Sequence, residues 1–495
     1  MLVTGMYMAE GNSTGGFNVN NALNSFLQSE ISNIAGKALD INVGMETVDD
    51  ADSGGKRTDY NFQFAKRFWN NRFRIVVGGK VSTGSTVQQD ETFIDNVSIE
   101  YRLDNSGTRY VKLFHDKNYE SIKVTSPVAG VVKAVNRGER RKIESIVIEP
   151  DNSGNKKTFD LKNDAKSVLL ESGLWCMTRQ RPYDIVPKPD AEIRDVFVTC
   201  FDSAPLAPSL SVVLGEKRKY IEKGVEILKS LTKGNVYLGC REDEVFEAAN
   251  AETVIFKGPH PAGNAGVQAA NIAPVNKGET IITLDVVTLA RIGHLFTEGY
   301  INFDTTVAVV GSEVSTPKYM SCTIGCQIST LLNGNLKNDG ETVRIICGNV
   351  LSGVKTPKDA YLRAPYRQVT VIPELIHKDE FLGWASLSPK KFSVYHNFTH
   401  WLFGGKKSNE MDARINGGER AIVMSGEYDR MLPMDIYSEF LIKAIIAFDI
   451  DKMEQLGIYE VAPEDFALAE YADTSKLELQ RIVREGLDRM RKEME

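Results

Sequence analysis

One short stretch of the sequence combines glycines with side chains that could hold a small molecule. Residues 258–268 read GPHPAGNAGVQ, and they lie between a β-branched run at residues 254–256 and a helical run at residues 267–270. A glycine-rich loop between a strand and a helix can direct backbone N–H groups and the helix N-terminus towards an anion or a polar ring. The spacing does not match G-x-G-x-x-G, so nucleotide binding does not follow from the motif. The loop is either a working site or a structural relic of one.

Two histidines stand inside well-defined motifs, His260 in this loop and His294 in the run RIGHLF. A histidine can donate a hydrogen bond or a proton to a ligand carbonyl, and Asn264 and Gln268 could donate a hydrogen bond in the same way. The alternative for each histidine is a structural hydrogen bond to a nearby carbonyl of the chain. Both interpretations stay open from the sequence.

The six cysteines are scattered, and Cys322 and Cys326 form the one close pair. A C-x3-C spacing without a second pair nearby is a weak indication of a metal site, and small buried apolar residues are the more common interpretation. No four-cysteine pattern for an iron–sulfur cluster is present. We therefore predict no metal site, and the scarcity of cysteine fits a reducing compartment.

The elements that would position these residues alternate between strands and helices. Short β-branched runs at residues 196–199, 236–238 and 253–256 alternate with loops and with a helix through residues 220–231, which indicates an α/β sheet with crossover connections. Before this part, residues 22–39 show helical periodicity, and four period-two runs between residues 41 and 103 predict an antiparallel meander. The C-terminal part is helical, and residues 473–475 would cap its last helix.

Bulk properties narrow the class of protein. The chain has 495 residues, which suggests about three domains. A net charge of −7 argues against a nucleic-acid partner. No stretch reaches the ~18 apolar residues of a membrane span, and the N-terminus lacks the features of a secretory signal.

Several long motifs after residue 124 resemble one family. They are TSPVAG at residues 125–130, ESGLW at 171–175, RPY at 181–183, the loop at 258–268 and RIGHLF at 291–296. Over residues 124–495, the chain resembles NqrA, a component of the sodium-translocating NADH:quinone reductase. In the flavin-carrying, NADH-binding subunit of respiratory complex I, which is related, the equivalent loop helps to hold the flavin.

The resemblance implies a peripheral subunit on the cytoplasmic side of the inner membrane that contributes to quinone binding and reduction coupled to sodium export. Its partners would be subunits B–F, which carry the NAD, flavin and iron–sulfur sites, so this chain would bind no cofactor and would be inactive alone. Ubiquinone or menaquinone would be the substrate. A structural scaffold without a ligand site is an alternative. The candidate ligand-binding residues are Gly258, His260, Gly263, Asn264, Gly266, Gln268 and His294.

The leading part of the chain resembles another family. Runs such as FAKRFWNNR at residues 64–72 and VSIEYRL at 97–103 are similar to the end of the Bacteroidetes-type TamB, a translocation and assembly module of the outer membrane. The two resemblances meet near Tyr119, which predicts a chimera of two polypeptides. An envelope-assembly protein, periplasmic or in the outer membrane, is thus the second functional alternative. The meander could equally be a lipid-shielding sheet or a soluble one.

The expected organisation is a multidomain α/β and α+β chain. It comprises a TamB-like helix and meander (1–122), half of a biotinyl-like barrel-sandwich with a linker (123–190), a Rossmann-like α/β domain (191–315), a small β-rich domain of the β-grasp or SLBB type (316–405) and a helical region (406–495). Because the first half of the barrel-sandwich would be missing, residues 124–149 should expose apolar faces or borrow strands from the leading sheet.

Overall fold

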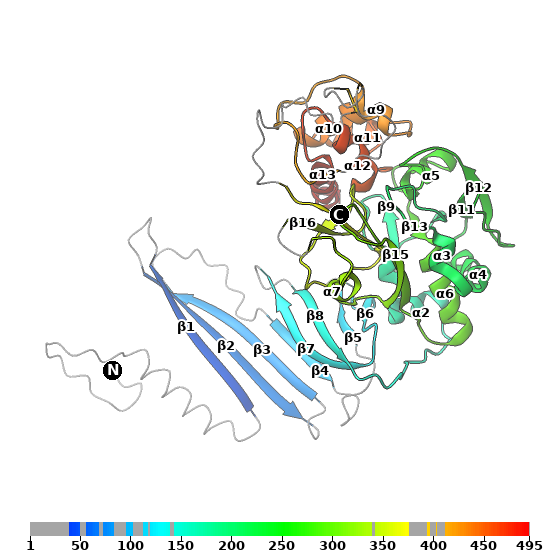
Figure 1. Ribbon diagram of the computed structural model, residues 1–495. Coiled ribbons are helices and arrows are strands. Elements are labelled where there is room, and N and C mark those ends of the chain that lie inside the picture. The colour runs from blue at the N-terminus through cyan, green and yellow to red at the C-terminus, as the bar shows by residue number, and fades with distance from the viewer. Residues whose placement is uncertain are drawn as a thin grey trace, which may run out of the picture. The chain divides into compact units, whose positions relative to one another are not determined.

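The chain divides into two compact units, Met1–Arg109 and Tyr110–Glu495 (Figure 1). The computed structural model describes residues 39–49, 56–68, 73–83, 96–101, 112–116, 119–138, 143–338, 342–375, 394–396, 402 and 411–494. Within this described part, no helix is both long and apolar enough to cross a membrane.

The first unit contains the predicted meander. Its antiparallel strands pair in chain order as β1 (Leu39–Asp49), β2 (Lys56–Phe68), β3 (Phe73–Thr83) and β4 (Asn96–Tyr101). The period-two alternation therefore identified all four strands. The helix predicted over residues 22–39 falls, apart from its last residue, outside the described residues.

The second unit begins with two small antiparallel pairs, β5 (Lys112–His115) with β6 (Lys123–Thr125), and β7 (Gly130–Arg137) with β8 (Ile143–Pro150). An isolated two-stranded ribbon cannot bury both of its faces. Val131, Val132 and Val135 on β7 are accordingly 57%, 40% and 43% exposed. The prediction of exposed apolar side chains within residues 124–149 is confirmed.

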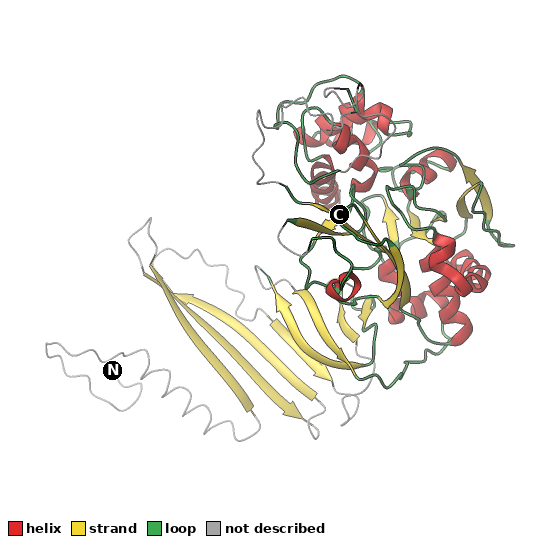
Figure 2. Cartoon of the chain, viewed as in Figure 1, coloured by secondary structure: helices red, strands yellow, loops and turns green. Residues whose placement is uncertain are grey.

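A mixed sheet with helices on both faces forms the centre of this unit (Figure 2). Its strands run in the order β12 (Glu252–Phe256), β11 (Val236–Arg241), β10 (Val196–Thr199), β13 (Ile281–Asp285) and β9 (Arg179–Arg181). The first four are parallel, and β9 pairs antiparallel with β13. The parallel strands are short and rich in Val, Ile and Leu because most of their side chains are buried. The α/β sheet with crossover connections is confirmed.

Two groups of helices cover this sheet. One face carries α2 (Ala165–Ser172), α3 (Leu210–Leu214), α4 (Ile221–Leu231) and α6 (Val286–Glu298), which share one hydrophobic core. The other face carries α5 (Ala265–Ile272), whose Ala269 packs with Phe197 of β10 and Ile281 of β13. The glycine-rich loop and the RIGHLF motif therefore belong to helices that pack in different cores.

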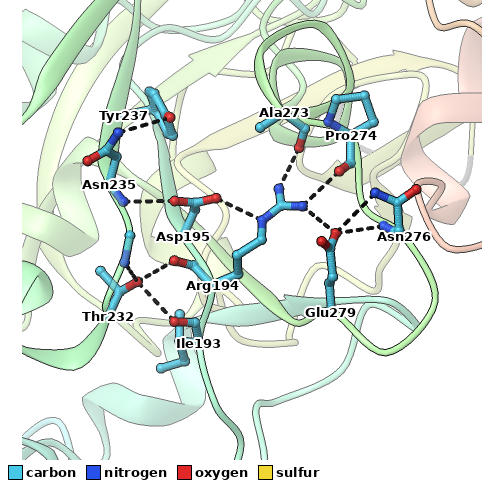
Figure 3. Close-up of polar contacts among 11 residues, drawn as sticks. Ile193, Arg194, Asp195, Thr232, Asn235, Tyr237, Ala273, Pro274, Asn276 and Glu279 are labelled. Carbon is cyan, nitrogen blue, oxygen red and sulfur yellow. Dashed lines mark hydrogen bonds and ion pairs between the residues drawn. The ribbon is translucent and has the colours of Figure 1, made fainter.

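A polar cluster fastens the amino ends of the parallel strands (Figure 3). The guanidinium of Arg194 donates to Asp195 Oδ2 at 2.8 Å and to the carbonyls of Ala273 and Pro274 at 2.7 and 2.9 Å, and it also pairs with Glu279. Asp195 Oδ1 in turn accepts the backbone N–H of Asn235. This end of the sheet is structural, because ligands of open parallel sheets bind at the opposite, carboxyl ends of the strands.

A second mixed sheet follows, with the order β15 (Lys318–Thr323), β14 (Asp304–Val310), β18 (Gln368–Pro373), β16 (Val343–Cys347) and β17 (Val354–Lys355). Strands β14 and β18 are parallel and the other neighbours are antiparallel. Helix α7 (Ile328–Leu332) completes its core. Because β14 pairs with β15 and β18, this sheet includes residues before position 316, where the sequence suggested that the small β-rich domain starts.

The C-terminal helices share a core of their own. They are α9 (Glu427–Met431), α10 (Ser438–Ala447), α11 (Ile450–Gln455), the 3-10 turn η5 (Pro463–Phe466), α12 (Ala467–Ala472) and α13 (Leu479–Met494). The proposed cap at residues 473–475 is wrong. Asp473 accepts the N–H groups of Ser475 and Leu477 before the helix, and Glu470 accepts the N–H of Gln480 at 2.7 Å.

Candidate functional site

The loop at residues 258–266 is fixed to the carboxyl end of β10. Thr199 Oγ1 donates to the Gly263 carbonyl at 2.8 Å, and Gln268 Nε2 donates to Thr199 Oγ1 and to the Ala262 carbonyl, each at 3.2 Å. Gln268 is 1% exposed. Its amide is therefore occupied in holding the loop, which is a structural role, whereas the sequence suggested that it could donate to a ligand.

Three glycines of the loop serve the packing of the chain itself. Gly258 has φ +135°, a conformation that side chains disfavour. A Cβ on Gly263 would lie 2.7 Å from the Ser203 nitrogen, and one on Gly266 would lie 2.6 Å from Asp465 Oδ2. Gly263 and Gly266 allow close approach, as a ligand-binding loop would require, but the groups that approach belong to the protein.

A buried ion pair covers the start of α5. Arg181 Nη1 donates to Asp465 Oδ2 at 3.1 Å, and Arg181 Nη2 contacts Glu464 Oε1 at 3.3 Å. The side chains of Arg181 and Asp465 are 1% and 0% exposed. Asn264 Nδ2 donates to Asp465 Oδ1 at 3.2 Å, so the carboxylate lies where the helix dipole favours negative charge. The protein's own carboxylate thus occupies the position at which an anionic ligand would be expected.

The carboxyl of Glu464, next to Asp465 in the chain, has a raised pKa. Burial of the carboxyl and the adjacent Asp465 carboxylate raise the pKa of Glu464 to about 7, although Arg181 acts in the opposite direction. The side chain as a whole is 49% exposed, while its Oε1 lies against the buried guanidinium of Arg181. This carboxyl therefore changes charge near neutral pH, at the contact between the α/β domain and the C-terminal helices.

His260 lies inside this closed region. Its Nδ1 is 3.0 Å from Ser203 Oγ, which accepts the N–H of Gly263. Its Nε2 is buried and has no hydrogen-bond partner among the described residues. Burial lowers the pKa of His260, so the ring is neutral at physiological pH.

His294 lies on α6, away from the loop, and shares no hydrogen-bond partner with His260 in the described part of the chain. Its Nδ1 is 3.0 Å from the Tyr300 carbonyl, which can only accept, so Nδ1 carries the proton. The ring stands between Tyr220 and Tyr300, with ring centroids 4.8 and 4.9 Å away in edge orientation. Burial lowers the pKa of His294. The neutral ring therefore keeps Nε2 as a hydrogen-bond acceptor for a ligand.

A pocket of about 580 Å³ adjoins His294. Its wall combines apolar and polar side chains, among them Val212, Leu214, Lys217, His294, Thr305 and Cys322. The Thr305 hydroxyl is buried without a hydrogen-bond partner in the described chain. Lys217 donates to the Asp304 carbonyl, and burial lowers the pKa of its ammonium. The volume is within the range typical of small-ligand sites.

The arrangement fits a ring that carries oxygen substituents. Val212 and Leu214 offer apolar contact, and Nε2 of His294 can accept from a hydroxyl. Because a neutral histidine whose Nδ1 is already bonded cannot donate through Nε2, the proposed donor role of His294 needs protonation first. Among the described residues, no group of three His, Cys, Asp or Glu side chains could hold a metal ion.

The structure brings together Gly258, His260, Gly263, Asn264, Gly266 and Gln268, but it separates them from His294. Sequence reasoning missed Lys217 and Thr305 as pocket residues. A lysine in the charged run GEKRKY is expected on the exposed surface, and a threonine in a strand gives no indication of a binding site. It also missed Asp465 as the partner of Arg181. Arg181 itself was visible in the RPY motif at residues 181–183, but its role was not.

Fold and site together define a multidomain α/β protein with a pocket for a small, partly apolar ligand. Family models of NqrA match three parts of the chain: the N-terminal barrel-sandwich hybrid domain at residues 98–151, the second alpha/beta domain at residues 161–301 and the C-terminal domain at residues 306–358. These matches cover the glycine-rich loop and most of the pocket beside His294, except its residues 302–305.

Curated relatives agree with the family models. The NqrA component of the Na(+)-translocating NADH-quinone reductase from Saccharophagus degradans is 38% identical over 395 residues, which cover 77% of this chain and 87% of the relative. The protein of the same name from Vibrio anguillarum is 34% identical over 435 residues, covering 85% and 96%. The chain belongs to the NqrA family.

The comparisons also bear on the leading segment. They give no support to a TamB-like segment or to a chimera. The barrel-sandwich match starts at residue 98, upstream of residue 123, where the sequence suggested that this family begins. A junction at Tyr119 would therefore lie inside the matched region, and the resemblance of the leading residues to TamB does not mark where the family starts.

Proposed function

We propose that this chain is the NqrA component of a sodium-pumping NADH:quinone oxidoreductase, where it contributes to quinone binding and reduction coupled to sodium export. The observation that carries this proposal is the similarity to named relatives over most of both chains. The partners are then subunits B–F of the complex. The chain docks peripherally, on the cytoplasmic side of the membrane, and exerts its effect through these partners.

Within this function, the pocket beside His294 is the site for the quinone head group. It offers apolar contact from Val212 and Leu214 and an acceptor nitrogen in His294, which suits a hydroxyl of the reduced ring. Residues Gly258, His260, Gly263, Asn264, Gly266 and Gln268 act as a structural loop. Their polar groups are largely bonded within the chain, which supports the relic interpretation of this loop.

NAD, flavin and iron–sulfur chemistry is assigned to the partner subunits, so the purified chain carries no cofactor and does not oxidise NADH. The order of the parallel strands, β12-β11-β10-β13, supports a Rossmann-like relationship to the complex I flavin subunit. A biotinyl-like form of the barrel-sandwich, an SLBB-type sheet and the five domain limits given above remain predictions.

A foreign origin of the leading residues is a separate proposal. It is supported by the division of the chain after Arg109, and it is weakened by the family match that begins at residue 98. Long-read sequencing across codons 110–130 in the source genome decides between a joined gene and an assembly error. No observation favours the outer-membrane assembly function or the pure scaffold.

The proposed function is tested by titrating the purified full-length chain with a short-chain, water-soluble quinone while tryptophan fluorescence is recorded. We expect saturable binding, and co-purification of the chain with the membrane components of the complex. Binding that rises linearly with quinone concentration and never saturates would argue against a quinone site. Failure to assemble with those components would argue against a place in this complex.

A further inference from the structure

Two pairs of cysteines are in contact within the second unit. Cys200 directly follows β10, Cys240 lies on the neighbouring parallel strand β11, and both are 0% exposed. Cys322 and Cys326 lie at the end of β15, and both are half-buried. The two members of each pair pack in one hydrophobic core, Cys200 and Cys240 in that of the parallel sheet and Cys322 and Cys326 in that of the second mixed sheet. The chain therefore offers a shielded pair and an accessible pair for comparison.

A tight turn holds the accessible pair together. The N–H of Cys326 donates to the Thr323 carbonyl at 3.0 Å, and the turn passes through Gly325 at φ +88°. Two further backbone hydrogen bonds hold the turn: the N–H of Ile324 donates to the Phe303 carbonyl, and the N–H of Leu362 donates to the Cys326 carbonyl. The backbone is thus fixed on both sides of the turn that separates the two cysteines.

The two thiols are not equivalent. The hydrogen bond from Cys322 lowers the pKa of Cys326, whereas the pKa of Cys322 is raised by the same contact and by burial. A thiolate is the nucleophilic form of cysteine, so the direction of these shifts favours Cys326 as the attacking residue and Cys322 as the resolving one. Cys322 also lines the pocket beside His294, between Ser321 and Thr323.

We propose that Cys322 and Cys326 are a reversible, oxidant-sensitive disulfide site, and that its oxidation changes ligand binding in the adjoining pocket. The oxidant is hydrogen peroxide. The Cys326 thiolate attacks one peroxide oxygen, an S–O bond forms, the O–O bond breaks, and hydroxide leaves and takes up a proton. The Cys322 sulfur, after losing its proton, attacks the sulfenic acid, the S–S bond forms, and the second oxygen leaves as water.

Such a site suits a reducing compartment, where disulfides are transient and act as sensors. The effect on the pocket rests on the proposed quinone function, but the disulfide itself does not. Closing it removes the Cys322 thiol from the pocket wall and restrains β15 against the turn. A change of one small group in a pocket wall alters binding by about tenfold.

The test treats the purified full-length chain with increasing hydrogen peroxide, alkylates the remaining thiols under denaturing conditions and maps the peptides by mass spectrometry. We expect a Cys322–Cys326 disulfide at the lowest peroxide concentrations, reversed by dithiothreitol, while Cys200 and Cys240 are still alkylated. In Cys322→Ser, a dimedone adduct on Cys326 should appear instead. Independent alkylation of Cys322 and Cys326 at every dose, or equal oxidation of the shielded pair, would overturn the proposal.

Quinone titration before and after oxidation examines the link to the pocket. We expect the dissociation constant of the wild-type chain to change by about tenfold and that of Cys326→Ser to respond less than about twofold. A disulfide that forms without any change in quinone affinity overturns the link. If the reduced chain binds no quinone, the proposed function fails, while the peptide map still decides whether the disulfide site exists.

Discussion

The two histidine motifs are equally good candidates for a ligand site in the sequence, but the fold leaves different groups free to contact a ligand around each histidine. Around His260, the glycines, the amides and the helix start are occupied by Ser203, Arg181 and Asp465 of the same chain. Around His294, a pocket of about 580 Å³ remains, and Nε2 of the ring can accept a hydrogen bond from a ligand. The loop with the longer motif is therefore the one that is closed to ligands. A long sequence motif can reflect tight packing within the chain as readily as ligand binding.

The largest expected effect concerns the ion pair that closes the loop. Arg181→Ala leaves the Asp465 carboxylate buried and without its guanidinium partner, so the free energy of unfolding should fall by about 3–5 kcal/mol. Urea denaturation followed by circular dichroism measures this. The matched control is Arg481→Ala, whose exposed pairs with Glu478 and Glu485 should contribute about 0–1 kcal/mol. Equal losses in both variants would show that the loop is not held closed by this pair.

A smaller effect is expected from filling the space that Gly266 leaves. In Gly266→Ala, the new Cβ would meet Asp465 Oδ2 at 2.6 Å and Arg181 Nη2 at 2.9 Å, which should cost about 1–3 kcal/mol. Gly418→Ala is the control, because nothing in the described chain lies within 4 Å of its added Cβ. Thermal unfolding of the two variants compares them. A neutral Gly266→Ala would mean that Asp465 can move away from the helix start and that the region is more open than described.

The smallest effect is a pH dependence at the same contact. The folded-state pKa of Glu464 is raised to about 7, so the folded protein binds this proton more tightly than the unfolded chain does. Its contribution to stability is therefore present below the unfolded pKa and is lost as pH rises from about 5 to 8. Glu464→Gln should flatten the curve of unfolding free energy against pH in that window. A wild-type curve that rises there, relative to the variant, would contradict the raised pKa.

Much of the fold could be predicted from the sequence because it depends on local periodicity. The strands β10, β11 and β12 and the helix α4 all correspond to runs with a clear repeat of apolar residues. The partners of the candidate site residues could not be predicted. Arg181 and Asp465 are 284 positions apart, and no local pattern encodes such a contact.

The pocket beside His294 could not be predicted from the sequence for the same reason. His294 comes from α6 and Thr305 from β14, and the two meet only when the α/β sheet packs near the second mixed sheet. The expected cap at residues 473–475 failed through a related effect, since Glu470, from the preceding helix, supplies the acceptor. Side chains that act across elements are set by tertiary packing, which the spacing along one element does not report.

The affinity of two single variants for a reduced quinone (quinol) tests the central claim most directly. The account predicts that His294→Ala weakens binding of a short-chain quinol by about tenfold, the size of the one ligand hydrogen bond that the acceptor Nε2 would lose. His260→Ala should bind as the wild type does, with thermal unfolding confirming that both variants are folded. Loss of affinity in His260→Ala together with unchanged affinity in His294→Ala would contradict the account and return the site to the glycine-rich loop.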